Sequence, residues 1–140
     1  MNYVDTSVLV AALTIETNTL RAERWLTQAA GGDLVVSDWV VAEFSAALSI
    51  KLRVGSIELH QRDKALVAFA TMINESLRVA SIATDHFRTA ARFAERYELG
   101  LRAGDALHLA IANNQSATLC TLDKGLARAG KALGVATILV

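Results

Sequence analysis

The sequence predicts an α/β protein in which a parallel sheet of about five strands lies between layers of helices. Short apolar runs of strand length alternate along the chain with longer segments whose apolar residues recur every three or four positions. Such alternation produces βαβ units, which build parallel sheets covered on both faces. The 140 residues are 53% apolar and include no proline, which favours a single domain over residues 1–140 with short connections.

The beginning of the chain predicts one strand and two helices. Residues 2–5, Asn-Tyr-Val-Asp, form a short apolar run that we expect to be a buried strand ending at Asp5. A turn then leads into a short helix over residues 8–13. Asn18 is a favourable N-cap for a second helix over residues 19–30, and the glycine pair that follows ends this helix.

The middle of the chain predicts a strand followed by two longer helices. Residues 33–37 form the strand, and Ser37 or Asp38 caps the first helix, which ends at Gly55. The second helix occupies residues 56–77. Its spacing predicts these residues on the inward face: Leu59, Leu66, Phe69, Ala70 and Ile73.

The last part of the chain predicts three strands and three helices, with two consecutive helices between the first strand and the second. Thr84 and Asp85 cap the first of these helices, and Asp105 begins the second, which is very apolar. The strands occupy residues 78–82, 117–122 and 136–140, and the helices occupy residues 87–97, 105–113 and 123–133.

The balance of charge does not decide whether the partner is a nucleic acid. The 14 basic residues equal the 14 acidic ones, and a net charge of zero argues at first against such a partner. If four acids form a metal site, the 14 basic residues outnumber the other 10 acidic residues by four, and bound cations offset the charge of the site itself. Charge therefore neither supports nor excludes RNA.

Cysteine usage and hydropathy indicate the compartment. Cys120 is the only cysteine, so it has no internal disulfide partner, and its apolar surroundings predict a small buried side chain. The N-terminus lacks the basic region of a signal peptide, and no apolar run approaches the ~20 residues needed to span a membrane. We expect a cytoplasmic protein with no membrane partner.

Four carboxylates have unusually apolar neighbours: Asp5, Glu43, Asp105 and Asp123. Asp5 and Asp123 lie at the carboxyl ends of predicted parallel strands, where ligands bind in open α/β sheets. Glu43 and Asp105 lie near the beginnings of helices that start at the same edge. All four side chains can therefore converge on one crevice, although each alone could also serve as a helix cap or a turn residue.

A converged group of carboxylates requires a cation. Their charges repel one another, and an ionised carboxylate near a core costs several kcal/mol unless it is paired or bound to metal. The oxygen ligands come without a cluster of cysteine or histidine. This favours Mg²⁺ or Mn²⁺ over zinc.

Four short motifs carry a resemblance to a known family. Asp5-Thr-Ser, Ala42-Glu43-Phe44, Asp105-Ala-Leu-His-Leu-Ala and Thr121-Leu-Asp123 follow one another in the order and approximate spacing of PIN domains. The resemblance covers the whole chain. At this length the chain most resembles the VapC toxins of VapBC toxin–antitoxin pairs.

The resemblance implies a fold, an activity and partners. It implies a three-layer α/β/α sandwich with Mg²⁺- or Mn²⁺-dependent cleavage of RNA. Asp5, Asp105 and Asp123 would be metal ligands, and Glu43 a ligand or the base that positions water. Hydroxyl groups would support these carboxylates through hydrogen bonds, from Thr6, Ser7 and Thr121, although ordinary turn or cap chemistry also explains them. A separate small antitoxin and a homodimer are the expected protein partners.

The remaining histidines and one arginine stripe have simpler interpretations. His108 lies one turn beyond Asp105, and we expect it to be packed in the interior or to support a metal ligand indirectly. His60 and His86 lie among charged residues and are expected at the surface. Arg88, Arg92 and Arg96 form a stripe that is either a solvated helix face or a contact with the RNA backbone.

Other functions remain as alternatives. A strand-end aspartate also begins phosphatases of the haloacid dehalogenase type, but those need a second aspartate where Ser7 stands. A housekeeping or DNA-directed PIN nuclease would share the four acids. A catalytically inactive PIN scaffold would not need them.

Overall fold

A five-stranded sheet, with every pair of neighbouring strands parallel, forms the middle of the protein. The computed structural model describes all 140 residues. The order across the sheet is β3-β2-β1-β4-β5. The strands are β1 (Asn2–Val4), β2 (Leu34–Ser37), β3 (Arg78–Ala80), β4 (Thr118–Thr121) and β5 (Thr137–Leu139). The predicted number and direction of the strands are therefore confirmed.

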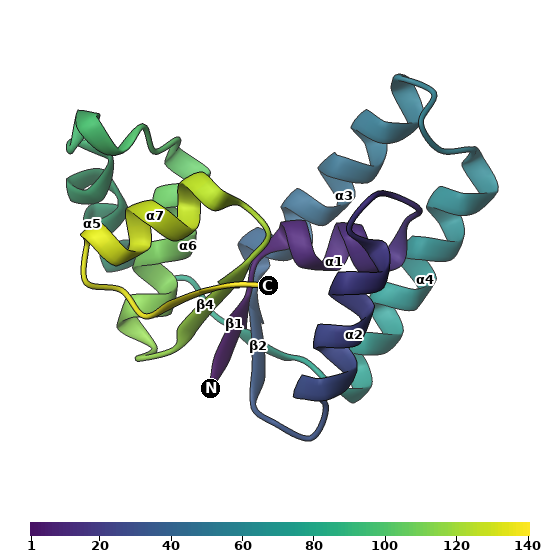
Figure 1. Cartoon of the computed structure of the whole chain (residues 1–140), viewed down its shortest axis with the longest axis horizontal. Coiled ribbons are helices and arrows are strands. Elements are labelled where there is room, and N and C mark those ends of the chain that lie inside the picture. The colour runs from purple at the N-terminus through teal and green to yellow at the C-terminus, as the bar shows by residue number, and fades with distance from the viewer.

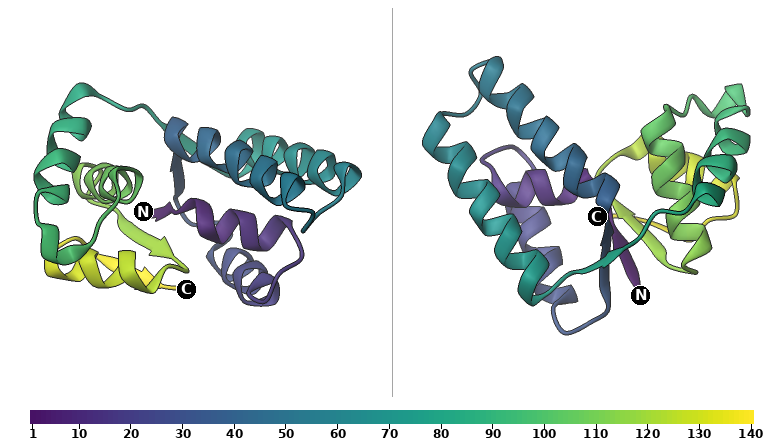
Figure 2. Two further views of the ribbon diagram at one scale, coloured as in Figure 1. Left: turned by 90° about the horizontal axis from the view of Figure 1, so that it is seen from above. Right: turned by 180° about the vertical axis from the view of Figure 1, so that it is seen from behind.

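Helices cover both faces of this sheet. They are α1 (Thr6–Leu13), α2 (Thr19–Ala29), α3 (Asp38–Arg53), α4 (Leu59–Glu75), α5 (Thr84–Ala94), α6 (Ala103–Asn114) and α7 (Lys124–Ala132), with a 3-10 turn at Tyr97–Leu99. Figure 1 shows α1 to α4 on one side of the strands and α5 to α7 on the other, and Figure 2 shows the same division from above and from behind. This is the predicted α/β/α sandwich.

The three central strands supply the middle of the core. Tyr3, Val4, Val35 and Leu119 have no exposed surface, as expected for parallel strands covered on both faces. Cys120 is also fully buried, which confirms that prediction. None of the seven helices is long and apolar enough to cross a membrane.

Several local predictions need correction. The α1 helix begins at Thr6, two residues earlier than predicted, and α4 begins three residues later, at Leu59. Leu59 and Ala70 are exposed rather than inward. Asn18 makes no side-chain capping bond; instead the hydroxyl of Thr19 accepts from the amide of Glu16 at 2.8 Å. Thr19 thus closes the turn that precedes α2, and the side-chain cap predicted for Asn18 is not made.

His86 is buried rather than at the surface, so that prediction was wrong. Only 4% of the residue is exposed, and its Nδ1 accepts a hydrogen bond from the amide of Ala83 at 2.9 Å. The ring lies in the first turn of α5 and folds back on the start of the helix, as a glutamate does in a capping box. His60 is exposed, as expected.

Candidate metal centre

The four predicted carboxylates line one open hollow of about 330 Å³ at the carboxyl edge of the sheet. Asp5 follows β1 and caps α1, and Asp123 follows β4 and caps α7. Glu43 comes from the second turn of α3, and Asp105 from the first turn of α6. Acidic residues as far apart in the chain as Asp5 and Asp123, 118 positions, therefore lie around one hollow.

The topology explains why the acids meet there. The chain moves outward from β1 to β2 and β3, then returns to the other side of β1 to form β4 and β5. The direction of winding reverses between β1 and β4, and the helices on either side diverge from that point. Ligands of open α/β sheets bind in the crevice at such a switch point.

Hydroxyl groups hold Asp5 in place. One carboxylate oxygen, Oδ2, accepts hydrogen bonds from the hydroxyl of Ser7 and, at 2.7 Å, from that of Thr121. Thr121 also accepts from the amide of Asp123 at 3.0 Å, which ties the two acids together. Thr6 donates to Glu43 Oε2 at 2.7 Å. The three hydroxyl groups thus form hydrogen bonds to the carboxylates of Asp5 and Glu43. Their part in metal binding stays a prediction.

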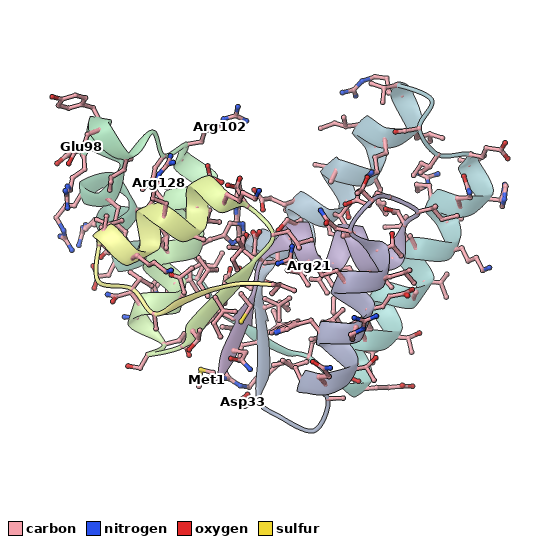
Figure 3. The ribbon with its side chains drawn as sticks, in the orientation of Figure 1. Met1, Arg21, Asp33, Glu98, Arg102 and Arg128 are labelled. Carbon is pink, nitrogen blue, oxygen red and sulfur yellow. The ribbon has the colours of Figure 1, made fainter.

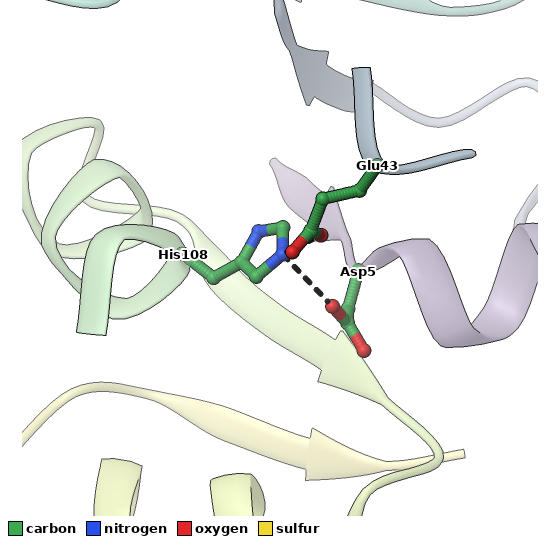
Figure 4. A group of neighbouring side chains, drawn as sticks. All are labelled: Asp5, Glu43 and His108. Atoms are coloured by element: carbon green, nitrogen blue, oxygen red, sulfur yellow. Dashed lines mark hydrogen bonds and ion pairs between the residues drawn. The ribbon is translucent and has the colours of Figure 1, made fainter. Parts of the chain in front are cut away.

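His108 lies between two of the acids (Figure 4). Its Nε2 is 2.6 Å from Glu43 Oε2 and 3.3 Å from Asp5 Oδ1. These three residues form a group whose potential ligand atoms all lie within 4.8 Å of one another. The imidazole is 1% exposed. It is therefore packed in the interior and contacts two of the acids directly, and both features agree with the expectation for this residue.

A buried chain of hydrogen bonds orients His108. The phenol oxygen of Tyr3 is 3.0 Å from His108 Nδ1 and 2.8 Å from the hydroxyl of Ser37. Burial raises the pKa of Tyr3, so the phenol keeps its proton. A neutral ring that donates from Nε2–H to Glu43 accepts at Nδ1 from Tyr3, which accepts from Ser37 in turn. A protonated ring donates from both nitrogens, and Tyr3 then donates to Ser37, so every member of the chain is satisfied in either state. Neither Tyr3 nor Ser37 was predicted to belong to the site.

The negative charges crowded in the hollow shift the pKa values of its acids and of His108. Burial raises the pKa of Asp105 above its ordinary value, and the charges of Asp123 and Asp5 raise it further. Burial alone would raise the pKa of Glu43, but the hydrogen bond and charge of His108, with the Thr6 hydroxyl, lower it overall. Burial alone would lower the pKa of His108, but Glu43 and Asp5 raise it. The site therefore favours a cation.

These donors suit a divalent metal ion. Carboxylate oxygens dominate the lining, and only one imidazole nitrogen lies among them. Asp105 and Asp123 line the hollow outside the tight group, and each already accepts one backbone bond, from Arg102 and Leu126 respectively. Each carboxylate has a second oxygen, so capping and metal binding are compatible in the same residue.

The sheet order and the acidic hollow are those of α/β proteins whose functional site lies at the switch point of the sheet. A sequence model of the PIN domain matches residues 3–132, nearly the whole chain. The chain belongs to the PIN domain family, whose members are nucleases that use divalent metals.

Solved structures share the fold over nearly the full length. VapC20 of Mycobacterium tuberculosis, described as a sarcin-ricin loop cleaving toxin, is 20% identical with a TM-score of 0.75, covering 100% of this chain and 98% of its own. VapBC2 of Rickettsia felis, bound to a promoter DNA fragment, is 20% identical with a TM-score of 0.71, and the match covers 99% of this chain and 98% of that one. FitAcB of Neisseria gonorrhoeae is 20% identical with a TM-score of 0.70, and the match covers 99% of this chain and 96% of that one. A comparison with curated protein sequences gives no match.

The buried chain gives a prediction about metal affinity. Tyr3→Phe removes the hydroxyl that holds His108, so the acids that His108 contacts lose a fixed neighbour. Groups that orient metal ligands from behind are each worth about 10- to 100-fold in affinity, and we expect about tenfold weaker metal binding. The measurement is the concentration of Mn²⁺ that half-maximally raises the melting temperature.

The matched control is Tyr97→Phe, because the side chain of Tyr97 is almost fully exposed. It should leave the Mn²⁺ titration unchanged. If Tyr3→Phe titrates like the wild type, the hydrogen-bonded chain has only a packing role.

Proposed function

We propose that this chain is a Mg²⁺- or Mn²⁺-dependent endoribonuclease and the toxin of a type II toxin–antitoxin pair. The observation that carries the proposal is the convergence of Asp5, Glu43, Asp105 and Asp123 on one hollow of a PIN domain. The alternative candidates within the family are a housekeeping or DNA-directed nuclease and an inactive scaffold.

Each acid has a role in this proposal. Asp5, Asp105 and Asp123 hold the metal, and Glu43 is a further ligand or the base that positions the attacking water. A bound divalent ion lowers the pKa of a water and neutralises charge on the phosphate oxygens. Thr6 keeps Glu43 pointed into the hollow, while Ser7 and Thr121 fix the rotamer of Asp5. Because these hydrogen bonds hold the carboxylates in position before the substrate binds, hydrolysis requires less reorganisation of the site.

The comparisons support the choice of RNA and of an antitoxin. VapC20 is described as a sarcin-ricin loop cleaving toxin, and a structure from Klebsiella pneumoniae is described as a toxin–antitoxin complex. We infer the same kind of partner here. A groove of about 410 Å³ between α1, α2 and α4 has an apolar side formed by Leu13, Ile15 and Ile57. It could hold the apolar face of an antitoxin segment, while an antitoxin arginine pairs with carboxylates of the hollow.

The direct test is cleavage of a labelled RNA as Mg²⁺ or Mn²⁺ is titrated into metal-free protein. Cleavage should appear with either ion, disappear with chelator and return when the ion is restored. A single-stranded DNA of the same sequence is the matched control and should be cleaved much more slowly. Faster cleavage of the DNA would favour the DNA-directed alternative, and cleavage of neither would favour a scaffold.

We further infer a homodimer through the helices that follow β2 and β3. An apolar hollow of about 240 Å³ lies between α5, α6 and the start of α3, lined mainly by Trp39, Phe87, Leu107 and alanines. Phe87 is 55% exposed there, which a partner surface would cover. Sedimentation at tens of micromolar, the order of magnitude for an interface of modest affinity, should show a dimer.

Phe87→Arg should shift the protein to monomer in the same measurement. Leu20→Arg on α2, where the side chain is also largely exposed, is the control and should leave the dimer intact. A wild-type protein that sediments only as monomer contradicts this inference.

A further inference from the structure

The C-terminal part of the chain has an uneven distribution of charge. From Gly100 to Val140 the only acidic residues are Asp105 and Asp123, and both belong to the proposed metal site. The same stretch contains four basic residues: Arg102, Lys124, Arg128 and Lys131. Once cations offset the two acids, this part of the protein is positively charged, although the whole chain is neutral.

Three of these basic residues form a stripe on α7. Lys124, Arg128 and Lys131 have the spacing i, i+4 and i+7, which places them on one face of the helix, and all three are exposed. The opposite face, with Leu126 and Ala129, is buried. We call these three residues the α7 stripe.

The α7 stripe begins at the site. Asp123, which lines the acidic hollow, is the N-cap of α7, and Lys124 is the next residue. From Lys124 to Lys131 the helix advances roughly 10 Å, so the stripe leads away from the hollow along one direction. Figure 3 shows Arg128 and Arg102 on the same half of the molecule, the half formed by α5, α6 and α7. Arg102 is the N-cap of α6 and its amide donates to Asp105, so its backbone lies beside one of the acids of the hollow.

The stripe of Arg88, Arg92 and Arg96, by contrast, is largely occupied within the protein. Its first two residues lie on α5 and the third follows the end of that helix, and we call it the α5 stripe. Arg88 pairs with Asp85 at 3.1 Å, and Arg96 pairs with Glu98 at 2.8 Å. Arg92 donates to the hydroxyl of Thr89 at 3.0 Å. No residue of the α7 stripe, nor Arg102, forms any of the protein's ion pairs. The α7 stripe is therefore free to bind an external anion, and the α5 stripe is less so.

We propose that the α7 stripe, with Arg102, binds the phosphate backbone of the RNA strand on one side of the scissile bond. This inference rests on the proposed ribonuclease function and assigns the surface that holds the substrate. The contacts carry no information about base sequence, because they go to phosphates. They hold the strand in register so that one phosphate lies in the acidic hollow, where the protein's own charge would otherwise repel it.

The test compares two triple variants with the same change of charge. One is Lys124→Ala/Arg128→Ala/Lys131→Ala, and the control is Arg88→Ala/Arg92→Ala/Arg96→Ala. Binding of a fluorescein-labelled single-stranded RNA is measured by anisotropy in Mg²⁺ at several salt concentrations, with Asp5→Asn in every protein to prevent cleavage. Each phosphate contact contributes about 0.7 to the slope of log affinity against log salt for a single strand.

We expect the α7 variant to lose roughly 2 units of that slope and to bind more than tenfold more weakly near 0.1 M salt. The α5 variant should keep most of the salt slope and most of the affinity for RNA. With Asp5 restored, the α7 variant should show a raised KM for RNA cleavage and a kcat close to that of the wild type. The single variant Arg128→Ala, which should lose about a third of the effect, serves if the triple variant folds poorly.

Equal slopes for the α7 variant and its parent overturn the inference, as does an equal loss in the α5 variant. If RNA is cleaved normally by the wild type while the α7 variant is unaffected, only this inference fails. If the wild type neither binds nor cleaves RNA, the proposed function fails with it.

Discussion

Asp5→Asn is expected to reduce metal-dependent RNA cleavage by about a hundredfold or more, since even groups behind a metal ligand can be worth that factor. The substitution keeps an amide oxygen that can accept from Ser7 and Thr121, so the local hydrogen bonds survive. It removes the charge that faces His108 and the hollow. The measurement is the rate of RNA cleavage at saturating Mg²⁺ and again at saturating Mn²⁺.

Asp105→Asn should reduce cleavage to a similar extent, and its stability serves as the control for folding. The folded state raises the pKa of Asp105 above its unfolded value, so the ionised form destabilises the metal-free fold at any pH above the folded pKa. Metal-free Asp105→Asn should therefore melt at or above the wild-type temperature at neutral pH. The difference should vanish as the pH falls below the unfolded pKa, where the carboxyl is neutral in both states.

Asp85→Asn is the matched control, because Asp85 is an exposed carboxylate that pairs with Arg88 and does not line the hollow. It should cleave RNA normally and gain no stability. Full activity of both Asp5→Asn and Asp105→Asn with either metal would remove these residues from the metal site.

The fold could be predicted because its signals are local and repeated. Each buried strand is a short apolar run, and each helix has its own period, so the order of elements follows from the sequence alone. The ends of helices were less predictable, since several residues near each end compete to cap it. Ser37 does accept from the amide of Val40, as expected, whereas Asn18 makes no side-chain capping bond.

The members of the hollow that could be predicted were its carboxylates and, from the family resemblance, the three hydroxyl groups that bond to them. A carboxylate among apolar neighbours is conspicuous in a sequence, and strand ends of a parallel sheet meet at one edge. Tyr3 and Ser37 gave no such signal, because tyrosine is common in strands and Ser37 was already explained as a helix cap. Their role depends on the distance to His108, a residue 105 positions from Tyr3 in the chain. Only the tertiary structure brings them together.

Expression of the wild-type chain alone in a bacterial host is expected to arrest growth, and co-expression of its antitoxin to restore it. An unrestrained ribonuclease damages RNA that the cell needs, so a producing cell requires an inhibitor. The acidic hollow suggests how inhibition works: an arginine of the antitoxin hydrogen-bonds a pair of carboxylates in bidentate fashion and takes the place of the metal. The measurement is growth after induction, with and without the small gene adjacent to this one.

The matched control is Asp5→Asn, which should be harmless at equal expression because it keeps the fold and loses the metal site. An Asp5→Asn protein that arrests growth as strongly as the wild type would show that toxicity does not depend on cleavage. Normal growth with abundant wild-type protein that cleaves RNA in vitro would instead favour a housekeeping nuclease. Rescue that fails when arginines of the antitoxin are replaced by alanine would support the proposed competition with metal, because the apolar groove between α1, α2 and α4 would still be available to the antitoxin.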